Sequence, residues 1–402
     1  MRVSTTTSRV LIFVVLCILT GAASLPQTAS RRTASSSPLQ DAAKDISAGK
    51  LDQAEKDLQS ALRSAPGDYH ALDLLGVVRV LQKQPAMAEE LFDQVVKAKP
   101  DFAPGHAHLG LLYLQQGRAQ DAVPELREAL RLDPGRTDAA AELVHILRDQ
   151  AKSASQQGNL DDAVSLLLEA RKYAPDDADV EYEFGLVALK RSLIDDAIPA
   201  FQKTLQLRKS DALAVFYLGY ALMDRARYEE ARQQFAQYAE LRPDDPSGYG
   251  ALGMALAGLG RFDDARPQFE KSIALDPKQS ESYYQLGLLD LDAGDYDAAT
   301  RNLQHALDTK PNDALTLTAL GRVEFEQKHY PEALSHLQQA AGQDDSLQEA
   351  HYYLGLTLAR MGRKQESDEQ LQIAARLEED RKQRGRHVLR LREPAGEPAS
   401  QK

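Results

Sequence analysis

Apolar and small residues recur along this chain as short helical faces, separated by turns at a nearly constant interval. The stretch Pro246–Gln279 is a representative unit of 34 residues, PSGYGALGMALAGLGRFDDARPQFEKSIALDPKQ. Its first half predicts a helix over Tyr249–Leu259 that ends at Gly260, because glycine readily adopts the left-handed conformation at a helix C-terminus. Its second half predicts a helix over about Asp263–Leu275, which Pro277 terminates because proline cannot continue a helix.

The second helix of this unit has one apolar face, since Ala265, Phe269 and Ser272 are spaced at i, i+4 and i+7. Two helices of this length cannot bury their apolar faces against each other alone. The unit therefore requires further copies stacked on both sides.

Copies of the unit recur through nearly the whole chain. With Gly253 placed at position 8, Ala265 falls at position 20 and Pro277 at position 32. Position 8 is filled by Gly76, Gly110, Gly185, Gly219, Gly253, Gly287, Gly321 and Gly355. Position 20 is filled by Ala54, Ala88, Ala122, Ala163, Ala197, Ala231, Ala265, Ala299, Ala333 and Ser367. Position 32 is filled by Pro66, Pro100, Pro134, Pro175, Pro243, Pro277 and Pro311. Small residues at positions 8 and 20 let the two helices approach closely, and the helix breaker at position 32 turns the chain toward the next pair.

This period and this pattern of small residues resemble the tetratricopeptide repeat (TPR) family, over roughly residues 35–381 and about ten units. The resemblance implies an all-α fold, a TPR solenoid in which antiparallel helix pairs form a right-handed superhelix. The first unit is imperfect, with Ala42 where glycine is usual, and the tenth has Glu379 in place of proline. Terminal repeats are expected to differ in this way because one of their faces is solvated.

The first 23 residues are typical of a secretory signal. Arg2 and Arg9 precede an apolar run of about ten residues, Val10–Leu19, and small residues follow at positions 21–23. The run is shorter than the ~20 residues that span a membrane. We therefore expect an exported protein, periplasmic or secreted, in which the segment is either cleaved or retained as a membrane anchor through residues 10–23.

The predicted organisation of the chain has four parts. These are a signal peptide or N-terminal anchor at 1–23, a flexible linker at 24–37, a TPR solenoid at 38–381 and a disordered tail at 382–402.

The fourth repeat is longer than the others, because Pro134 and Pro175 are 41 residues apart instead of 34. The seven additional residues fall in the first helix, predicted over 137–157. Seven residues are nearly two helical turns, so the apolar face drifts by only about 20°. We expect this helix to be about 10 Å longer than its neighbours and to project past them. It is either a ledge for a partner, a dimer contact or a tolerated insertion.

Composition limits the possible partners. The formal net charge of −12 argues against nucleic acid as a partner, because phosphate recognition requires basic stripes on the protein surface.

The single cysteine, Cys17, lies in the apolar N-terminal segment, so a mature chain without that segment has no disulfide and no thiolate metal ligand. The absence of N-x-[ST] sequons and of disulfides favours a bacterial source.

No catalytic residues, cofactor-binding residues or metal ligands are predicted, and we expect no enzyme activity. Residues 248–253 (GYGALG) match G-x-G-x-x-G, but they lie inside a predicted helix instead of between a strand and a helix. His106 and His108 are two apart on a helix, so their side chains diverge. The acidic pairs 161–162, 195–196 and 263–264 recur at one place in the repeat, which indicates helix capping and dipole complementarity.

In the TPR family the first helices line a concave groove, to which positions 2, 5, 9, 12 and 13 contribute. The resemblance therefore implies a partner-binding groove that includes Tyr182, Leu186, Phe216, Tyr220, Met254, Tyr284, Leu288, Arg322, Phe325 and Tyr352. The Lys and Asn residues with which one subfamily binds a C-terminal carboxylate are absent from positions 5 and 9 of the regular repeats. The alternative is that several of these aromatic residues belong to the core between neighbouring first helices.

An aromatic, methionine-containing groove suits an extended or helical apolar peptide, because Tyr and Phe provide contact area at low entropic cost. The chain is therefore expected to be a non-enzymatic protein–protein interaction scaffold outside the cytoplasm. Its partner would be a protein or peptide, without a nucleic acid and without a membrane span in the mature chain. The alternative is a periplasmic carrier or holdase, or an envelope-assembly factor, for exported polypeptides.

Overall fold

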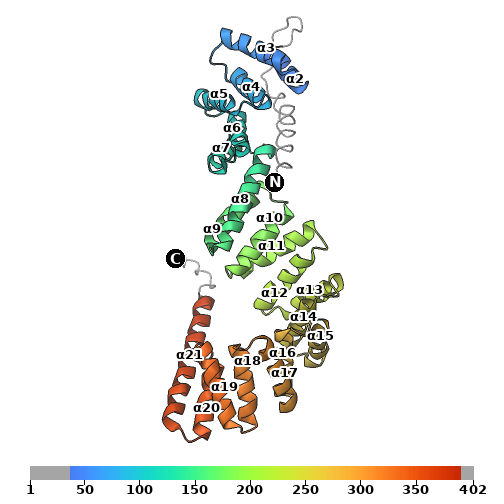
Figure 1. The fold of residues 1–402 in the computed structure, drawn as a ribbon, viewed down its shortest axis with the longest axis vertical. Helices are drawn as coiled ribbons and strands as arrows, with labels where there is room; N and C mark the ends of the chain where they lie inside the picture. Colours follow the sequence, from blue (N-terminus) through green and yellow to red (C-terminus); the bar gives the residue numbers. More distant parts are fainter. Residues whose placement is uncertain (1–36, 391–402) are drawn as a thin grey trace, which may run out of the picture. The chain divides into compact units, whose positions relative to one another are not determined.

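The computed structural model describes residues 37–390, and all regular secondary structure within them is helical (Figure 1). The helices form two compact units, which divide between Leu207 and Arg208. In each unit the helices pack as successive pairs, and the first helix of one pair also contacts the first helix of the next. The predicted all-α TPR solenoid is confirmed as stacked helix pairs. Within the described residues, no helix combines the length and the apolar character needed to cross a membrane.

Unit 1 contains five helix pairs. Their bounds are α2 Pro38–Ser47, α3 Leu51–Ser64, α4 Tyr69–Leu81, α5 Pro85–Ala98, α6 Ala103–Gln115, α7 Ala119–Leu132, α8 Thr137–Gln156, α9 Leu160–Tyr173, α10 Ala178–Lys190 and α11 Ile194–Leu207.

Unit 2 contains the remaining pairs. Their bounds are α12 Ala212–Asp224, α13 Tyr228–Leu241, α14 Pro246–Gly258, α15 Phe262–Leu275, α16 Ser280–Asp292, α17 Tyr296–Thr309, α18 Ala314–Glu326, α19 Tyr330–Gln343, α20 Gln348–Arg360 and α21 Lys364–Arg390.

The glycines at position 8 let a large side chain of the second helix lie against the backbone of the first. A Cβ atom on Gly253 would lie 2.6 Å from the ring of Phe269, and one on Gly219 would lie 2.6 Å from the ring of Phe235. Leucine takes the place of phenylalanine in other pairs, as at Gly287, where Leu303 is the near side chain. The small residues at position 20 are buried in all ten repeats, Ser367 included. The predicted reason for these small residues, close helix packing, is confirmed.

Close packing also explains the other glycines of the GYGALG stretch, which lies entirely within α14. Gly248 faces Tyr238, and a Cβ atom on it would lie 2.7 Å from that ring. At Gly250 a Cβ atom would meet the Ser282 hydroxyl at 3.2 Å. The Tyr238 hydroxyl donates a hydrogen bond to Asp245 Oδ2 at 2.5 Å. These glycines therefore serve packing, and the strand that a dinucleotide-binding loop requires is absent from the described residues.

Aspartate caps several of the first helices. Its side chain accepts backbone N–H groups of the first turn at Asp68, Asp177, Asp211, Asp245 and Asp313. The cap at Asp245 makes α14 begin at Pro246, three residues before the predicted start.

The acidic pairs of the second helices have a different role from these caps. Residues 161–162, 195–196 and 263–264 lie in the first turns of α9, α11 and α15, where negative charge complements the helix dipole, as predicted. Their predicted capping role is wrong for α9 and α15. The N-cap residues there are Asn159 and Arg261, and neither forms a side-chain cap hydrogen bond. The acidic pairs cannot be N-caps because they are the second and third residues of each helix.

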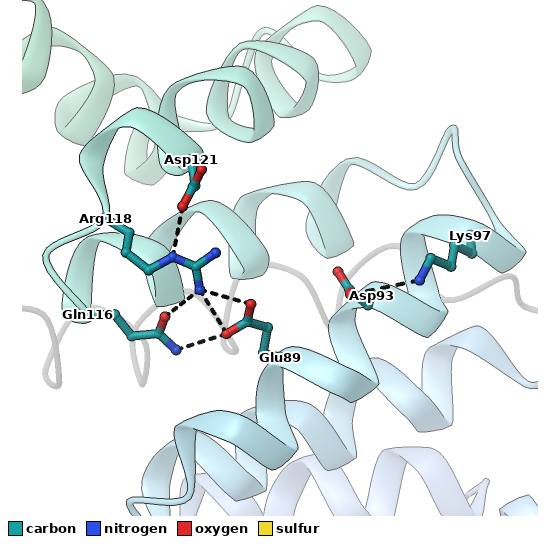
Figure 2. Close-up of polar contacts among 6 residues, drawn as sticks. All are labelled: Glu89, Asp93, Lys97, Gln116, Arg118 and Asp121. Atoms are coloured by element: carbon teal, nitrogen blue, oxygen red, sulfur yellow. Dashed lines mark hydrogen bonds and ion pairs between the residues drawn. The ribbon is translucent and has the colours of Figure 1, made fainter.

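Polar contacts tie consecutive helix pairs together in unit 1, as Figure 2 shows for Glu89 of α5. Arg118 Nη1 donates to Glu89 Oε1 at 2.9 Å, and Gln116 Nε2 donates to Glu89 Oε2 at 3.2 Å. The hydrogen bond from Arg118 lowers the pKa of Glu89. One repeat earlier, Glu55 of α3 likewise accepts a hydrogen bond from Arg79 Nη2 at 2.7 Å. In these two repeats the same carboxylate position thus connects one pair to the pair that follows.

The long helix of the fourth repeat is α8, which has 20 residues where the other complete first helices have 13. It contacts α6 and α7 as well as α9 and α10. Buried residues recur along it from Asp138 to Ala151. Most of its length therefore belongs to the core of unit 1, whereas residues 152–156 at its C-terminal end are half-buried or exposed. That the helix projects past its neighbours stays a prediction.

The C-terminal helix differs from its predicted length. The solenoid was predicted to end at residue 381, but α21 continues to Arg390. The physical reason is that residues 376–392 contain no proline, and Glu378 and Arg381 form an i,i+3 ion pair at 2.7 Å. The predicted signal or anchor at 1–23 and most of the predicted linker lie outside the described residues.

Candidate functional site

Unit 2 contains a pocket on the first helices of three consecutive repeats, with a volume of about 210 Å³. We call it the Arg322 pocket and define it by its lining residues. These are Tyr284, Leu288, Asp292, Leu315, Thr318, Ala319, Arg322, Leu347 and Glu349. Three of the ten residues predicted to bind a partner, Tyr284, Leu288 and Arg322, are brought together in it.

The repeat geometry explains why these residues meet. Tyr284 and Leu288 are four residues apart on α16, so they share one face of that helix. Arg322 occupies on α18 the repeat position that Leu288 occupies on α16, and α16 and α18 are in contact. Stacking of identical helix pairs therefore places equivalent positions side by side.

Arg322 is held by carboxylates from both neighbouring first helices. Its Nη2 lies 3.2 Å from Asp292 Oδ1 of α16, and its Nη1 lies 3.6 Å from Glu349 Oε1 of α20. The side chains of Asp292 and Glu349 are 63% and 54% exposed, whereas Arg322 is 29% exposed. One cation is thus shared by two acids whose outer sides face solvent.

The electrostatic environment of the pocket is negative. The pKa of Tyr284 is raised to about 12, first because the phenol is withdrawn from water and then because Glu281, Glu349 and Asp313 are near it. Because this pKa lies far above neutral pH, the phenol stays neutral through the physiological range.

One part of the pocket rim is apolar and accessible. The side chain of Leu315, on the first turn of α18, is 50% exposed, and Leu347 lies before α20. An exposed leucine next to a concave pocket is typical of an interaction surface. The sequence offered one signal for Leu315, because position 2 of a repeat is among those that contribute to the TPR groove. The neighbouring repeats have Glu281 and Glu349 at this position.

The other predicted residues lie outside this pocket. Phe216 packs against Phe235 and Tyr238, with ring centroids 5.9 and 4.7 Å apart, so much of its ring belongs to the core. Tyr220 stacks edge-on to Phe235 at 5.4 Å but is 38% exposed.

The remaining predicted groove residues divide between the two units. Tyr352 is 42% exposed on α20, and Phe325 packs against Tyr353 at 5.7 Å. Tyr182 and Leu186 are half-buried on α10 of unit 1, and Met254 is half-buried on α14. All ten residues keep some accessible surface, which binding requires, and their binding role stays a prediction.

The histidines do not converge on one site. His106 Nδ1 lies 2.7 Å from Glu125, and His108 Nδ1 lies 2.8 Å from Asp73, so each contacts its own carboxylate. In the part of the chain that the structure describes, no cluster of three or more His, Cys, Asp or Glu side chains is placed to hold a metal ion.

Curated proteins resemble parts of this chain. "Cellulose synthase 2 operon protein C" from Komagataeibacter xylinus is 34% identical over 151 residues, which are 35% of this chain. A probable UDP-N-acetylglucosamine–peptide N-acetylglucosaminyltransferase, SPINDLY, from Hordeum vulgare is 28% identical over 112 residues, which are 28% of this chain. The chain spans 12% of the length of each of these two relatives.

Solved structures are similar at lower identity. MamA from Desulfovibrio magneticus RS-1, from residue 41 to its end, has a TM-score of 0.40 and 20% identity, covering 42% of this chain and 96% of that chain. A chain of the Cut9–Hcn1 hetero-tetramer of the APC/C has a TM-score of 0.48 and 13% identity, covering 84% of this chain and 92% of its own.

Family models identify the repeats directly. Models described as tetratricopeptide repeat match residues 46–101, 82–137, 113–182, 182–246, 251–314, 284–347 and 318–380. The matches cover well over half of the chain and agree with the helix pairs of both units. This chain is a member of the tetratricopeptide repeat family.

Proposed function

We propose that this protein is a non-enzymatic interaction scaffold that binds a peptide or protein at the Arg322 pocket. The observation that carries the proposal is an accessible pocket built from the first helices of three repeats, lined by both apolar and charged side chains, with Arg322 between two carboxylates. Apolar contact area provides affinity, and a few fixed polar groups provide orientation and specificity.

The first test is recovery of partners from the exported fraction of the source organism. The double variant Leu315→Ser, Arg322→Gln is expected to lose most of the partner that the wild type retains, because it removes an exposed apolar contact and the central charge. Truncation of a binding hot spot costs about 2 kcal/mol or more, which is roughly 30-fold in affinity.

The matched control is Phe262→Ser, which removes a side chain that is 52% exposed on α15, outside the pocket. The control should retain the partner. Equal recovery by wild type, pocket variant and control, or recovery of no partner by any of them, would contradict the proposal.

We also propose that the protein acts outside the cytoplasm, in the periplasm or after secretion. The support is the sequence of residues 1–23, with its basic start, apolar run and small residues. Cell fractionation tests this location: the full chain is expected in the periplasmic or secreted fraction, and recovery from the cytoplasm alone would contradict it.

A second candidate is an assembly factor for an envelope polymer. One observation favours it: the relative from Komagataeibacter xylinus that is 34% identical over 151 residues is named for a cellulose synthase operon. Under this candidate the pocket-dependent partner would belong to a polymer-synthesis machine. A partner population of many unfolded exported chains would instead indicate a carrier.

A further inference from the structure

The charge of the Arg322 pocket indicates which kind of peptide it accepts. We propose that the pocket binds a polypeptide segment in which a lysine or arginine is flanked by apolar residues. The proposal rests on the proposed function, since it names the chemistry of the ligand for the same pocket.

The first argument is the local balance of charge. Two carboxylates, Asp292 and Glu349, share the single guanidinium of Arg322, which leaves a net negative charge at the rim. Both carboxylates are more than half exposed, so each can contact a second cation on its solvent side. An arriving anion would have to displace one of these ion pairs before it reached Arg322.

The second argument extends over the first helices of unit 2. Their exposed acids outnumber their accessible bases, Arg322 and Arg360. The exposed acids are Asp224, Glu281, Asp292, Glu326 and Glu349. Complementary charge steers an oppositely charged ligand to such a surface and disfavours a ligand of like charge.

The third argument concerns the flanking residues of the ligand. Leu288, Leu315 and Leu347 line the pocket beside the ion pairs, so an apolar side chain can enter while a neighbouring cation reaches the rim. Lysine and arginine have apolar stems, and such stems pack on apolar surface while the charged head stays hydrated. The pocket thus matches alternating apolar and basic residues.

The test uses the full chain and three fluorescein-labelled peptides in which leucine alternates with lysine, glutamine or glutamate. Affinities are measured by fluorescence anisotropy. The lysine peptide is expected to bind at least about tenfold more tightly than the glutamate peptide, and the difference should shrink at high salt because exposed charges are screened.

The variant Asp292→Asn, Glu349→Gln is expected to remove most of the preference for the lysine peptide and to leave the glutamine peptide within about threefold of its wild-type affinity. The matched control, Asp263→Asn with Glu270→Gln, neutralises two exposed acids on α15 and should leave the preference unchanged.

Three results would overturn the inference: a preference for the glutamate peptide that Arg322→Gln abolishes, a lysine preference that survives neutralisation of the rim, or no binding of any of the peptides. The proposed function is judged separately, by whether a natural partner depends on Leu315 and Arg322. A partner that depends on Leu315 and Arg322 but lacks basic residues would contradict the inference about charge and leave the proposed function standing.

Discussion

Replacement of Phe269 by alanine is expected to destabilise the α14–α15 pair by about 3–5 kcal/mol, the usual cost of truncating a buried phenylalanine. The Phe269 side chain is 0% exposed and fills the space beside Gly253. Hydrogen exchange of the α14 and α15 amides is the appropriate measurement, because a stack of repeats opens locally as well as globally. Phe262→Ala, on the exposed side of the same helix, should change the exchange little.

The packing account also predicts a coupling between Phe269 and Gly253. Gly253→Ala alone should destabilise by about 1–3 kcal/mol, because its Cβ atom would lie 2.6 Å from the phenylalanine ring. In the Phe269→Ala background the ring is gone, and alanine should instead favour the helix by about 1 kcal/mol. Additive effects of the two substitutions would contradict the account.

Replacement of Leu147 by alanine is expected to destabilise unit 1 by about 2–5 kcal/mol. Leu147 is 0% exposed on α8 and belongs to a core cluster with Leu143, Val180 and the buried residues of α7. Urea unfolding followed by circular dichroism measures the loss.

The matched control for Leu147 is His145→Ala, on the exposed face of the same helix. His145 pairs with Asp149 there, with Nδ1 and Oδ2 3.3 Å apart, and both side chains are about 70% exposed. An exposed pair of this kind contributes at most about 1 kcal/mol. Equal effects of the two substitutions would contradict the assignment of Leu147 to the core of unit 1.

Much of the fold could be predicted from the sequence, because a strict period reports the packing of each repeat. Glycine at position 8 and alanine at position 20 mark where two helices approach closely, and the burial of Ala265 beside the Gly253–Phe269 contact matches this expectation. The acidic pairs illustrate the limit of the period. It indicated a helix start but did not separate the N-cap residue from the acids of the first turn, which lie only two and three residues after it.

The Arg322 pocket could be predicted only in part. Tyr284, Leu288 and Arg322 follow from repeat position, but the contributions of Leu315, Leu347 and Glu349 depend on how three consecutive pairs are stacked. The same dependence decides which aromatic residues are core. Phe216 occupies the repeat position of Tyr284, yet it packs on Tyr238, because that repeat has a tyrosine where others have a small residue.

The length of α8 shows a similar limit. Its seven additional residues were evident from the proline spacing, and the retained helical phase was correctly anticipated. Whether added turns project or pack depends on the neighbouring pairs. Here Val144, Ile146 and Leu147 are buried in the middle of the helix, whereas residues 152–156 are half-buried or exposed.

The central claim, that the Arg322 pocket is the surface this protein uses, is tested most directly by photo-crosslinking in living cells of the source organism. A photo-reactive residue at position 315 replaces an exposed leucine on the pocket rim, and one at position 262 replaces an equally exposed phenylalanine on α15. We predict a discrete adduct from position 315 and none from position 262. Adducts from position 262 alone, or the same adducts from both positions, would contradict the claim.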